Sequence, residues 1–109
     1  MTNQTVICTY RVRPGAEDEF RALLARHWPT LRELGFVTGA ESVVYRELAD
    51  LPTYVEIFTW AADGYEQARE HPAVLAIWAP MDPLLEARDG REKWEFPHYE
   101  RVRLDHHDA

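Results

Sequence analysis

The stretch TYVEIFTWAADGYEQAREH, residues 53–71, decides the fold because its pattern changes halfway along. Residues 53–60 carry the β-branched and aromatic side chains that are typical of a strand. Asp63 is followed three residues later by Glu66, a spacing that resembles a capping box and predicts that a helical region begins there. The chain is therefore expected to pass from a strand into a helix within these residues.

Three prolines interrupt the helical region that follows. A proline inside a helix removes one backbone hydrogen bond and collides with the preceding turn, so Pro72, Pro80 and Pro83 cannot all be interior. We expect a first segment that ends near His71, a second segment, and a last turn with Asp82 as its cap. The second segment places three apolar residues on one face: Val74, Trp78 and Met81.

Upstream of residue 53, the sequence predicts a strand, a helix and another strand. Residues 5–12 are rich in β-branched and aromatic side chains and end at the turn signal Pro14–Gly15. A helix is expected to follow and to end at Gly35, and residues 36–47 are typical of a strand. The apolar stripe of that helix recurs at helical spacing. Its members are Phe20, Leu23, Leu24, His27, Leu31 and Leu34.

The last expected element is a fourth strand over residues 91–101, where Pro97 indicates an edge position or a bulge. The order strand, helix, strand, strand, helix, strand predicts an α+β fold, the ferredoxin-like βαββαβ arrangement with both helices on one side of an antiparallel sheet. One such domain is expected over residues 1–104. Residues 105–109 are expected to form a flexible C-terminal tail.

Apolar side chains occur on both faces of the expected strands. The segments VIC, VVY, YVEIF and WEF do not alternate between apolar and polar residues, as a sheet with one face in water would. An uncovered aromatic sheet would be a large adhesive patch. A second copy of the chain is the simplest cover, so a homodimer is expected.

Composition and charge exclude several classes of partner. The net charge is −7, from 12 basic and 19 acidic residues, which disfavours binding to nucleic acid. The chain has no apolar run approaching the roughly 18 residues that span a bilayer, so no membrane segment is expected. Its start lacks the features of a secretory signal and Cys8 is the single cysteine, which together predict a cytoplasmic protein.

Four segments carry a resemblance to a known family: VRPG (residues 12–15), AEDEF (16–20), YVEIFTWA (54–61) and AREHPAVLAIW (68–78). With them the sequence resembles the antibiotic biosynthesis monooxygenase-like group of dimeric α+β barrels. The resemblance covers most of the chain and implies this fold. Members of the group range from cofactor-free oxygenases that act on aromatic polyketides to haem-degrading enzymes, so the fold alone does not imply one reaction.

The haem-degrading branch of the group uses an asparagine on the first strand and a tryptophan and a haem-ligating histidine on the second helix. These positions fall on Cys8, Arg69 and Ala79, and none matches. Without the axial imidazole, iron would lack a protein ligand there. Histidine and carboxylate spacings also give little support to a metal site, so neither a metal nor a cofactor is expected.

A ligand cavity is expected between the helices and the sheet. Pro29 and Pro80 predict kinks that would leave space, and His27 is expected to point into it. A neutral imidazole can accept a proton near neutral pH, so His27 is a candidate catalytic base. His71 is the second candidate, because it matches a family position. The expected substrate-binding residues are Trp28, Tyr65, Trp78, Met81 and Tyr10.

The predicted function is that of a cofactor-independent monooxygenase acting on a small aromatic or polyketide-like compound. One alternative is a non-catalytic dimer that binds a small apolar ligand or serves in stress response, and another is a non-oxidative cyclase or isomerase with the same base. His27 has a simpler alternative role, a hydrogen bond to a carbonyl freed by Pro29. His71 could simply end a helical segment before Pro72.

Overall fold

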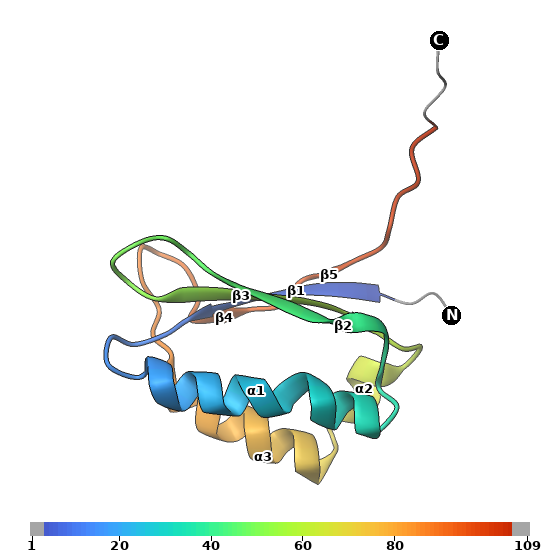
Figure 1. Cartoon of the computed structure of the whole chain (residues 1–109), viewed down its shortest axis with the longest axis horizontal. Helices are drawn as coiled ribbons and strands as arrows, with labels where there is room; N and C mark the ends of the chain where they lie inside the picture. The colour runs from blue at the N-terminus through green and yellow to red at the C-terminus, as the bar shows by residue number, and fades with distance from the viewer. Residues whose placement is uncertain (1–3, 106–109) are drawn as a thin grey trace.

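An antiparallel sheet with all helices against one of its faces forms the body of the protein (Figure 1). The structure is a computed structural model that describes residues 4–105. The strand order β2-β3-β1-β4, with β5 also paired to β1, is that of a ferredoxin-like sheet and confirms the predicted fold class. The strands are β1 (Gln4–Arg11), β2 (Val37–Arg46), β3 (Thr53–Trp60), β4 (Trp94–Glu95) and β5 (His98–Tyr99).

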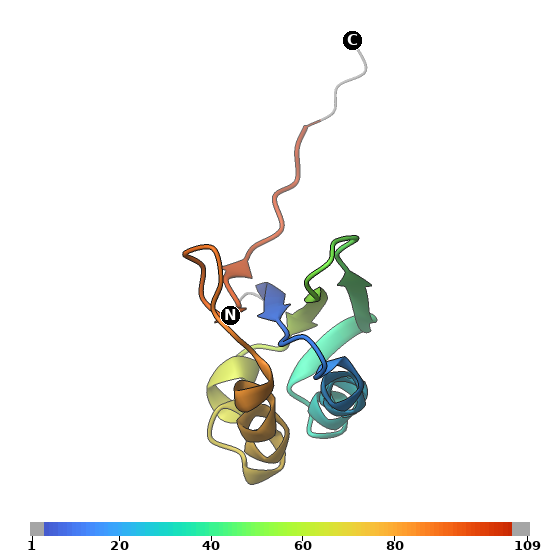
Figure 2. The same cartoon turned by 90° about the vertical axis from the view of Figure 1, so that its left-hand side faces the viewer.

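The helices lie side by side beneath the sheet, as the view along the strands shows (Figure 2). The second helical region is divided at Pro72 and near Pro83, as predicted, while Pro80 lies inside the helix between them. The first helix is continuous, and Pro29 lies inside it. The helices are α1 (Glu17–Glu33), α2 (Gly64–Ala68), α3 (Pro72–Met81) and the 3₁₀ turn η1 (Asp82–Leu84).

The predicted capping box at Asp63 is wrong. Asp63 has a φ of 61° and its side chain makes no capping hydrogen bond. A capping side chain needs an extended backbone at that position, which this left-handed conformation does not provide. The next residue, Gly64, packs closely against the preceding strand region, where a Cβ atom would collide with the carbonyl oxygen of Phe36. The predicted cap at Asp82 is also displaced by one residue, to Met81.

The predicted fourth strand is two short strands rather than one. Strands β4 and β5 both pair with β1 and are separated at Phe96 and Pro97. The carbonyl oxygen of Pro97 still accepts a hydrogen bond from the amide of Ile7 at 3.2 Å. This is the irregular edge position that the proline predicted, because proline itself has no amide proton to donate.

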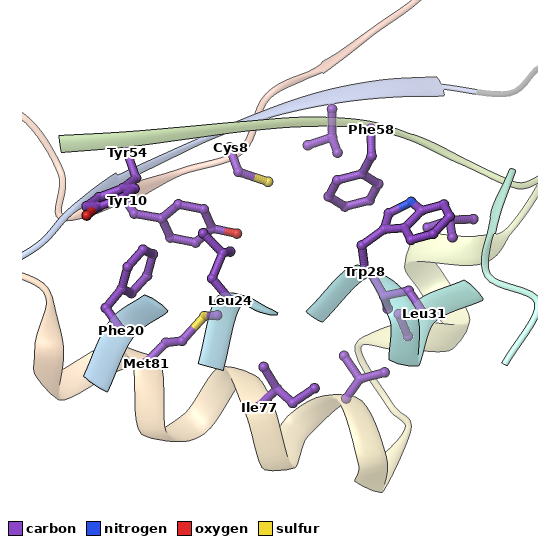
Figure 3. Close-up of a cluster of buried hydrophobic side chains, with 14 of the residues drawn as sticks. Cys8, Tyr10, Phe20, Leu24, Trp28, Leu31, Tyr54, Phe58, Ile77 and Met81 are labelled. Carbon is purple, nitrogen blue, oxygen red and sulfur yellow. The ribbon is translucent and has the colours of Figure 1, made fainter. Parts of the chain in front are cut away.

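The hydrophobic core lies between the sheet and the helices (Figure 3). Along β3 burial alternates strictly, so every second side chain faces the helices and is buried. Strand β1 runs antiparallel to β3 with Cys8 opposite Glu56 and Tyr10 opposite Tyr54. The covered face of β3 is therefore formed by four residues: Tyr54, Glu56, Phe58 and Trp60.

The helices leave the opposite face of the sheet open (Figure 2), and apolar side chains lie on that face. Tyr45 on β2 is 60% exposed and Leu51 is 45% exposed. Beyond β5 the chain leaves the body in an extended segment, on which Val102 and Leu104 are each 68% exposed (Figure 1). Residues 106–109 of the predicted tail, with His106 and His107, lie outside the described residues.

Within residues 4–105, no helix has the length and apolar character needed to cross a membrane.

Candidate functional site

A cavity of about 330 Å³ opens between the covered face of the sheet, helix α3 and the two short strands. Its walls are mainly aromatic, and they include two histidines. Small-ligand sites are concave, mostly apolar and furnished with a few polar groups, so this cavity has the expected character of one. It is lined by Val6, Cys8, Tyr10, His27, Phe58, Trp60, Tyr65, Trp78, Trp94, Phe96 and His98.

Three larger hollows have a different character. One, of about 900 Å³, lies over the uncovered sheet face and is lined largely by charged side chains. Another, of about 490 Å³, is a groove between α1 and β2, and the third, of about 390 Å³, borders the same two elements. Buried ionisable groups also occur there, Arg11 in the first and Tyr54 in the second, but a histidine lines none of the three. We therefore take the aromatic cavity as the candidate active site.

His27 is held from both sides at the wall of this cavity and is only 2% exposed. Its Nδ1 lies 3.0 Å from Oε1 and 3.2 Å from Oε2 of Glu56. On the other side, the indole Nε1 of Trp78 donates a hydrogen bond to Nε2 of His27 at 2.8 Å. An indole N–H can only donate, so Nε2 carries the lone pair and the ring proton is on Nδ1. The geometry thus assigns a neutral imidazole with its accepting nitrogen toward Trp78.

Glu56 is completely buried on β3 and receives two donors. The Nδ1–H of His27 is one, and the hydroxyl of Tyr10 donates to Oε1 at 2.8 Å as the other. A buried carboxylate is tolerated when hydrogen bonds compensate for its lost hydration. Burial, together with the nearby Cys8 and Glu56, raises the pKa of Tyr10 well above its ordinary value, so the phenol keeps the proton that it donates.

Cys8 lies beside this network as a neutral thiol. Burial, reinforced by the charge of Glu56, raises the pKa of Cys8 far above its ordinary value. A thiolate is the nucleophilic form of cysteine, and this environment disfavours it. Cys8 therefore contributes apolar wall to the cavity, as expected for a small buried side chain.

A second imidazole, His98 on β5, reaches the cavity from its outer end. Its Nδ1 lies 3.0 Å from the side-chain oxygen of Gln4, and its ring packs edge-on against Tyr65 with centroids 4.9 Å apart. Partial burial lowers the pKa of His98, so this ring is also neutral near pH 7. The cavity thus contains two uncharged imidazoles at different depths.

Four of the predicted site residues meet in the cavity, and three do not. His27, Tyr10, Tyr65 and Trp78 line it. The other three serve packing or capping. Trp28 borders the groove between α1 and β2, Met81 is buried in the core, and His71 caps α3 by accepting a hydrogen bond from the amide of Ala73 at 3.1 Å.

The two prolines do not open the cavity. Pro29 borders the groove between α1 and β2, Pro80 is exposed, and neither lines the aromatic cavity. The large rings of Trp78 and Trp94 line the cavity instead, edge to face with centroids 6.3 Å apart. The simpler role predicted for His27 is wrong as well, since its ring nitrogens contact two side chains rather than a carbonyl.

Glu56 is the main residue that the sequence analysis missed, although the sequence contains a signal for it. In TYVEIFTW, position 56 is in phase with the aromatic residues at 54, 58 and 60. A carboxylate in phase with large aromatic side chains lies on the covered face of a strand, where it needs a partner. His98 has no such signal, because strands of two residues show no period.

A second polar network lies at the surface, outside the cavity. Glu17 on α1 accepts hydrogen bonds from Arg46 Nε at 2.8 Å and from the hydroxyl of Tyr54 at 2.6 Å. The Arg46 and Tyr54 hydrogen bonds lower the pKa of Glu17 to about 2. Arg21 in turn donates to the Tyr54 oxygen at 2.6 Å. The network ties α1 to β2 and β3.

Among the described residues, no three His, Cys, Asp or Glu side chains lie close enough together to hold a metal ion.

Comparison of sequences finds neither a protein-family model nor a curated protein that matches the chain.

Comparison of structures finds clear similarity to solved proteins. A variant of SnoaB, a cofactor-independent oxygenase from Streptomyces nogalater, superposes with a TM-score of 0.75 over 95% of this chain and 97% of its own, at 19% identity. A candidate antibiotic biosynthesis monooxygenase from Bordetella bronchiseptica gives a TM-score of 0.73 over 94% and 100%, at 17% identity. One from Caulobacter crescentus gives 0.73 over 94% and 92%, at 14% identity. The chain shares the fold of antibiotic biosynthesis monooxygenase-like proteins, as the sequence resemblance predicted.

Proposed function

We propose that the protein is a cofactor-independent monooxygenase that acts on a small aromatic or polyketide-like compound with an acidic phenolic or enolic hydroxyl. One observation carries the proposal: a neutral imidazole, backed by a buried carboxylate, stands in the wall of an aromatic cavity. The cofactor-independent oxygenase SnoaB has the same fold, which supports the reaction type.

The cavity limits the size of the substrate. Its volume of about 330 Å³ lies at the low end of the roughly 300–1,000 Å³ range of small-molecule sites. Faces and edges of Phe58, Tyr65 and Trp94 surround it, and aromatic rings pack well against other flat rings. A planar compound of a few fused rings fits these walls better than a large or glycosylated one.

The chemistry requires a base and oxygen but no redox group on the protein. Removal of the hydroxyl proton by His27 gives an electron-rich anion, which can pass electrons to O₂. For a substrate with an activated CH₂ group the overall change is CH₂ + O₂ → C=O + H₂O. One oxygen atom enters the carbon, and the other leaves as water with the two hydrogens of the CH₂. All four electrons come from the substrate, so no external reductant is needed.

An oxygen-uptake assay with anthrone and dihydroxyanthrone tests this function. We expect uptake of one O₂ for each molecule of the corresponding quinone formed, and no product under nitrogen. Product formation under nitrogen would instead indicate a non-oxidative cyclase or isomerase. Saturable binding without any product would indicate a ligand-binding protein, and either result would contradict the proposal.

We also propose that the functional unit is a homodimer joined through the uncovered sheet face. Tyr45 and Leu51 lie exposed there, and the extended segment with Val102 and Leu104 offers further apolar contact. Sedimentation should show a dimer that Tyr45→Glu dissociates. The matched variant Leu75→Glu changes a residue that is 42% exposed on α3, away from this face, and should stay dimeric. A monomeric wild-type protein would contradict the proposal.

The cytoplasmic location stays a prediction.

A further inference from the structure

Trp78 blocks the one nitrogen of His27 that could accept a proton. Both ring nitrogens of His27 are occupied, Nδ1 by the carboxylate of Glu56 and Nε2 by the indole N–H of Trp78 at 2.8 Å. Any substrate proton that His27 takes must arrive at Nε2, because Nδ1 already carries a proton. The base therefore cannot act while the indole stays in place.

We propose that Trp78 is a displaceable hydrogen-bond donor and that the site selects ligands whose hydroxyl replaces the indole N–H at Nε2 of His27. Glu56 orients the His27 ring and stabilises its protonated form. This inference rests on the proposed role of His27 as the base. It assigns a specificity-determining role to Trp78 and a positioning role to Glu56. It narrows the substrate to compounds that can donate a hydrogen bond, namely phenols and enols.

Trp78 is the partner that can move. His27 and Glu56 are 2% and 0% exposed and are fixed by two contacts between Nδ1 and the carboxylate, whereas Trp78 is only partly buried on α3. The aromatic rings that face it, Tyr65 and Trp94, lie at centroid distances of 6.5 and 6.3 Å. Rotation of the indole about its side-chain bonds would free Nε2 and leave the other pair intact.

The use of the Trp78 indole also differs from that of the other three tryptophans. In the described part of the chain, the buried Nε1 atoms of Trp28, Trp60 and Trp94 have no hydrogen-bond partner. Their role is packing, whereas the Trp78 N–H is aimed at the base. Trp94 lines the same cavity, so it offers a matched control for Trp78.

Glu56 makes proton acceptance at Nε2 favourable. When a ligand hydroxyl replaces the indole, its O–H bond breaks, an Nε2–H bond forms and the Nδ1–H stays toward Glu56. The products are a phenolate and an imidazolium that contacts a buried carboxylate. In a low-dielectric interior this ion pair is much stronger than in water, and the Tyr10 hydroxyl holds the carboxylate in position.

The test uses para-nitrophenol, whose anion absorbs visible light, and its methyl ether, which fits the same space but cannot donate. At a pH where free nitrophenol is largely protonated, the wild-type protein should bind the phenol more tightly than the ether and show the phenolate band. Trp78→Phe should raise the affinity for the phenol relative to that for the ether about two- to tenfold, the effect of one hydrogen bond that no longer has to be broken. Its effect on ether binding should be that of the lost ring area alone.

Trp94→Phe controls for the loss of ring area, and it should change the affinities of phenol and ether by equal factors. Equal effects of Trp78→Phe on phenol and ether would overturn the role given to Trp78.

Glu56→Gln keeps an acceptor for Nδ1–H but removes the charge. We expect it to reduce the bound phenolate at least tenfold while ether binding, which reports an intact cavity, stays the same. The ¹⁵N spectrum of His27 should still show the proton on Nδ1. A full phenolate band in Glu56→Gln would overturn the role given to Glu56.

These readouts need neither oxygen nor turnover, so they separate this inference from the proposed function. Phenolate formation that follows the predicted pattern, without oxygen uptake on anthrones, would support the inference and contradict the monooxygenase. Oxygen-dependent turnover that is unaffected by Trp78→Phe and Glu56→Gln would support the monooxygenase and overturn the inference.

Discussion

Two carboxylate networks on neighbouring parts of the sheet use similar components for different purposes. In the cavity, Glu56 accepts from Tyr10 and faces His27. At the surface, Glu17 accepts from Tyr54 and faces Arg46. The two tyrosines are direct register partners on β1 and β3, so the networks lie close together.

The two networks differ in the nitrogen base and in burial. Arg46 is always charged, and its pair with Glu17 is partly exposed, so that network is a permanent salt bridge which joins secondary-structure elements. His27 is buried and can exist in two charge states. The difference shows what a carboxylate and a tyrosine need in order to support proton transfer. Their nitrogen partner must be able to gain and lose a proton, as His27 can and Arg46 cannot, and it must be buried away from water.

Replacing the nitrogen partner of each carboxylate should have the largest effect, and the loss of turnover should be much greater in the cavity than at the surface. His27→Gln removes the proton acceptor and should lower oxygen-dependent turnover of dihydroxyanthrone by about 10²–10⁴-fold, the usual contribution of a general base. Arg46→Gln makes the same kind of change in the surface network and should leave kcat within about twofold, since surface ion pairs contribute little. Equal turnover in both variants, measured by oxygen uptake, would mean that His27 is not the base.

Removing each tyrosine hydroxyl should affect stability unequally. Tyr10→Phe leaves a completely buried carboxylate with one donor fewer and should reduce the free energy of unfolding by about 1–3 kcal/mol. Tyr54→Phe should cost less than about 1 kcal/mol, because water can replace the hydroxyl at the partly exposed end of that network. Urea titrations of both variants measure the difference. A larger loss of unfolding free energy in Tyr54→Phe than in Tyr10→Phe would contradict this difference between the two networks.

The smallest effect is the pH dependence of the surface network. The pKa of Glu17 is lowered from its ordinary value of 4.5 to about 2 in the folded protein. Its contribution to stability is therefore complete above pH 4.5 and is lost as the pH falls toward 2. Glu17→Gln should be less stable than wild type at pH 7, and this difference should vanish between those two values. Urea titrations at several pH values check this, and a difference that persists at pH 2 would contradict the assignment.

The sequence predicted the fold well because the fold depends on local periodicity. The changes of period at residues 5–12, 15–35 and 53–71 correspond to strands and helices in the structure. Pro72 and Pro83 correctly marked the divisions of the second helical region. The failures at Asp63 and Asp82 concern single capping positions, which depend on backbone angles that a spacing rule does not contain.

The site was only partly predictable, because its polar contacts join residues far apart in the chain. His27 was selected from its place on the apolar stripe, but its partners Glu56 and Trp78 are set by the register of β3 and the packing of α3. Neighbouring residues on a helix point about 100° apart. Trp28, which follows His27 and is not on the stripe, accordingly borders the groove while His27 faces the cavity.

The central claim is that this protein keeps a neutral base buried beside a carboxylate. The most direct test is to determine which ring nitrogen of His27 carries the proton. ¹⁵N NMR of histidine-labelled protein at neutral pH distinguishes the two ring nitrogens. The structure predicts a proton on Nδ1 and an unprotonated, hydrogen-bonded Nε2. A proton on Nε2, or a ring that exchanges freely between both forms, would contradict it.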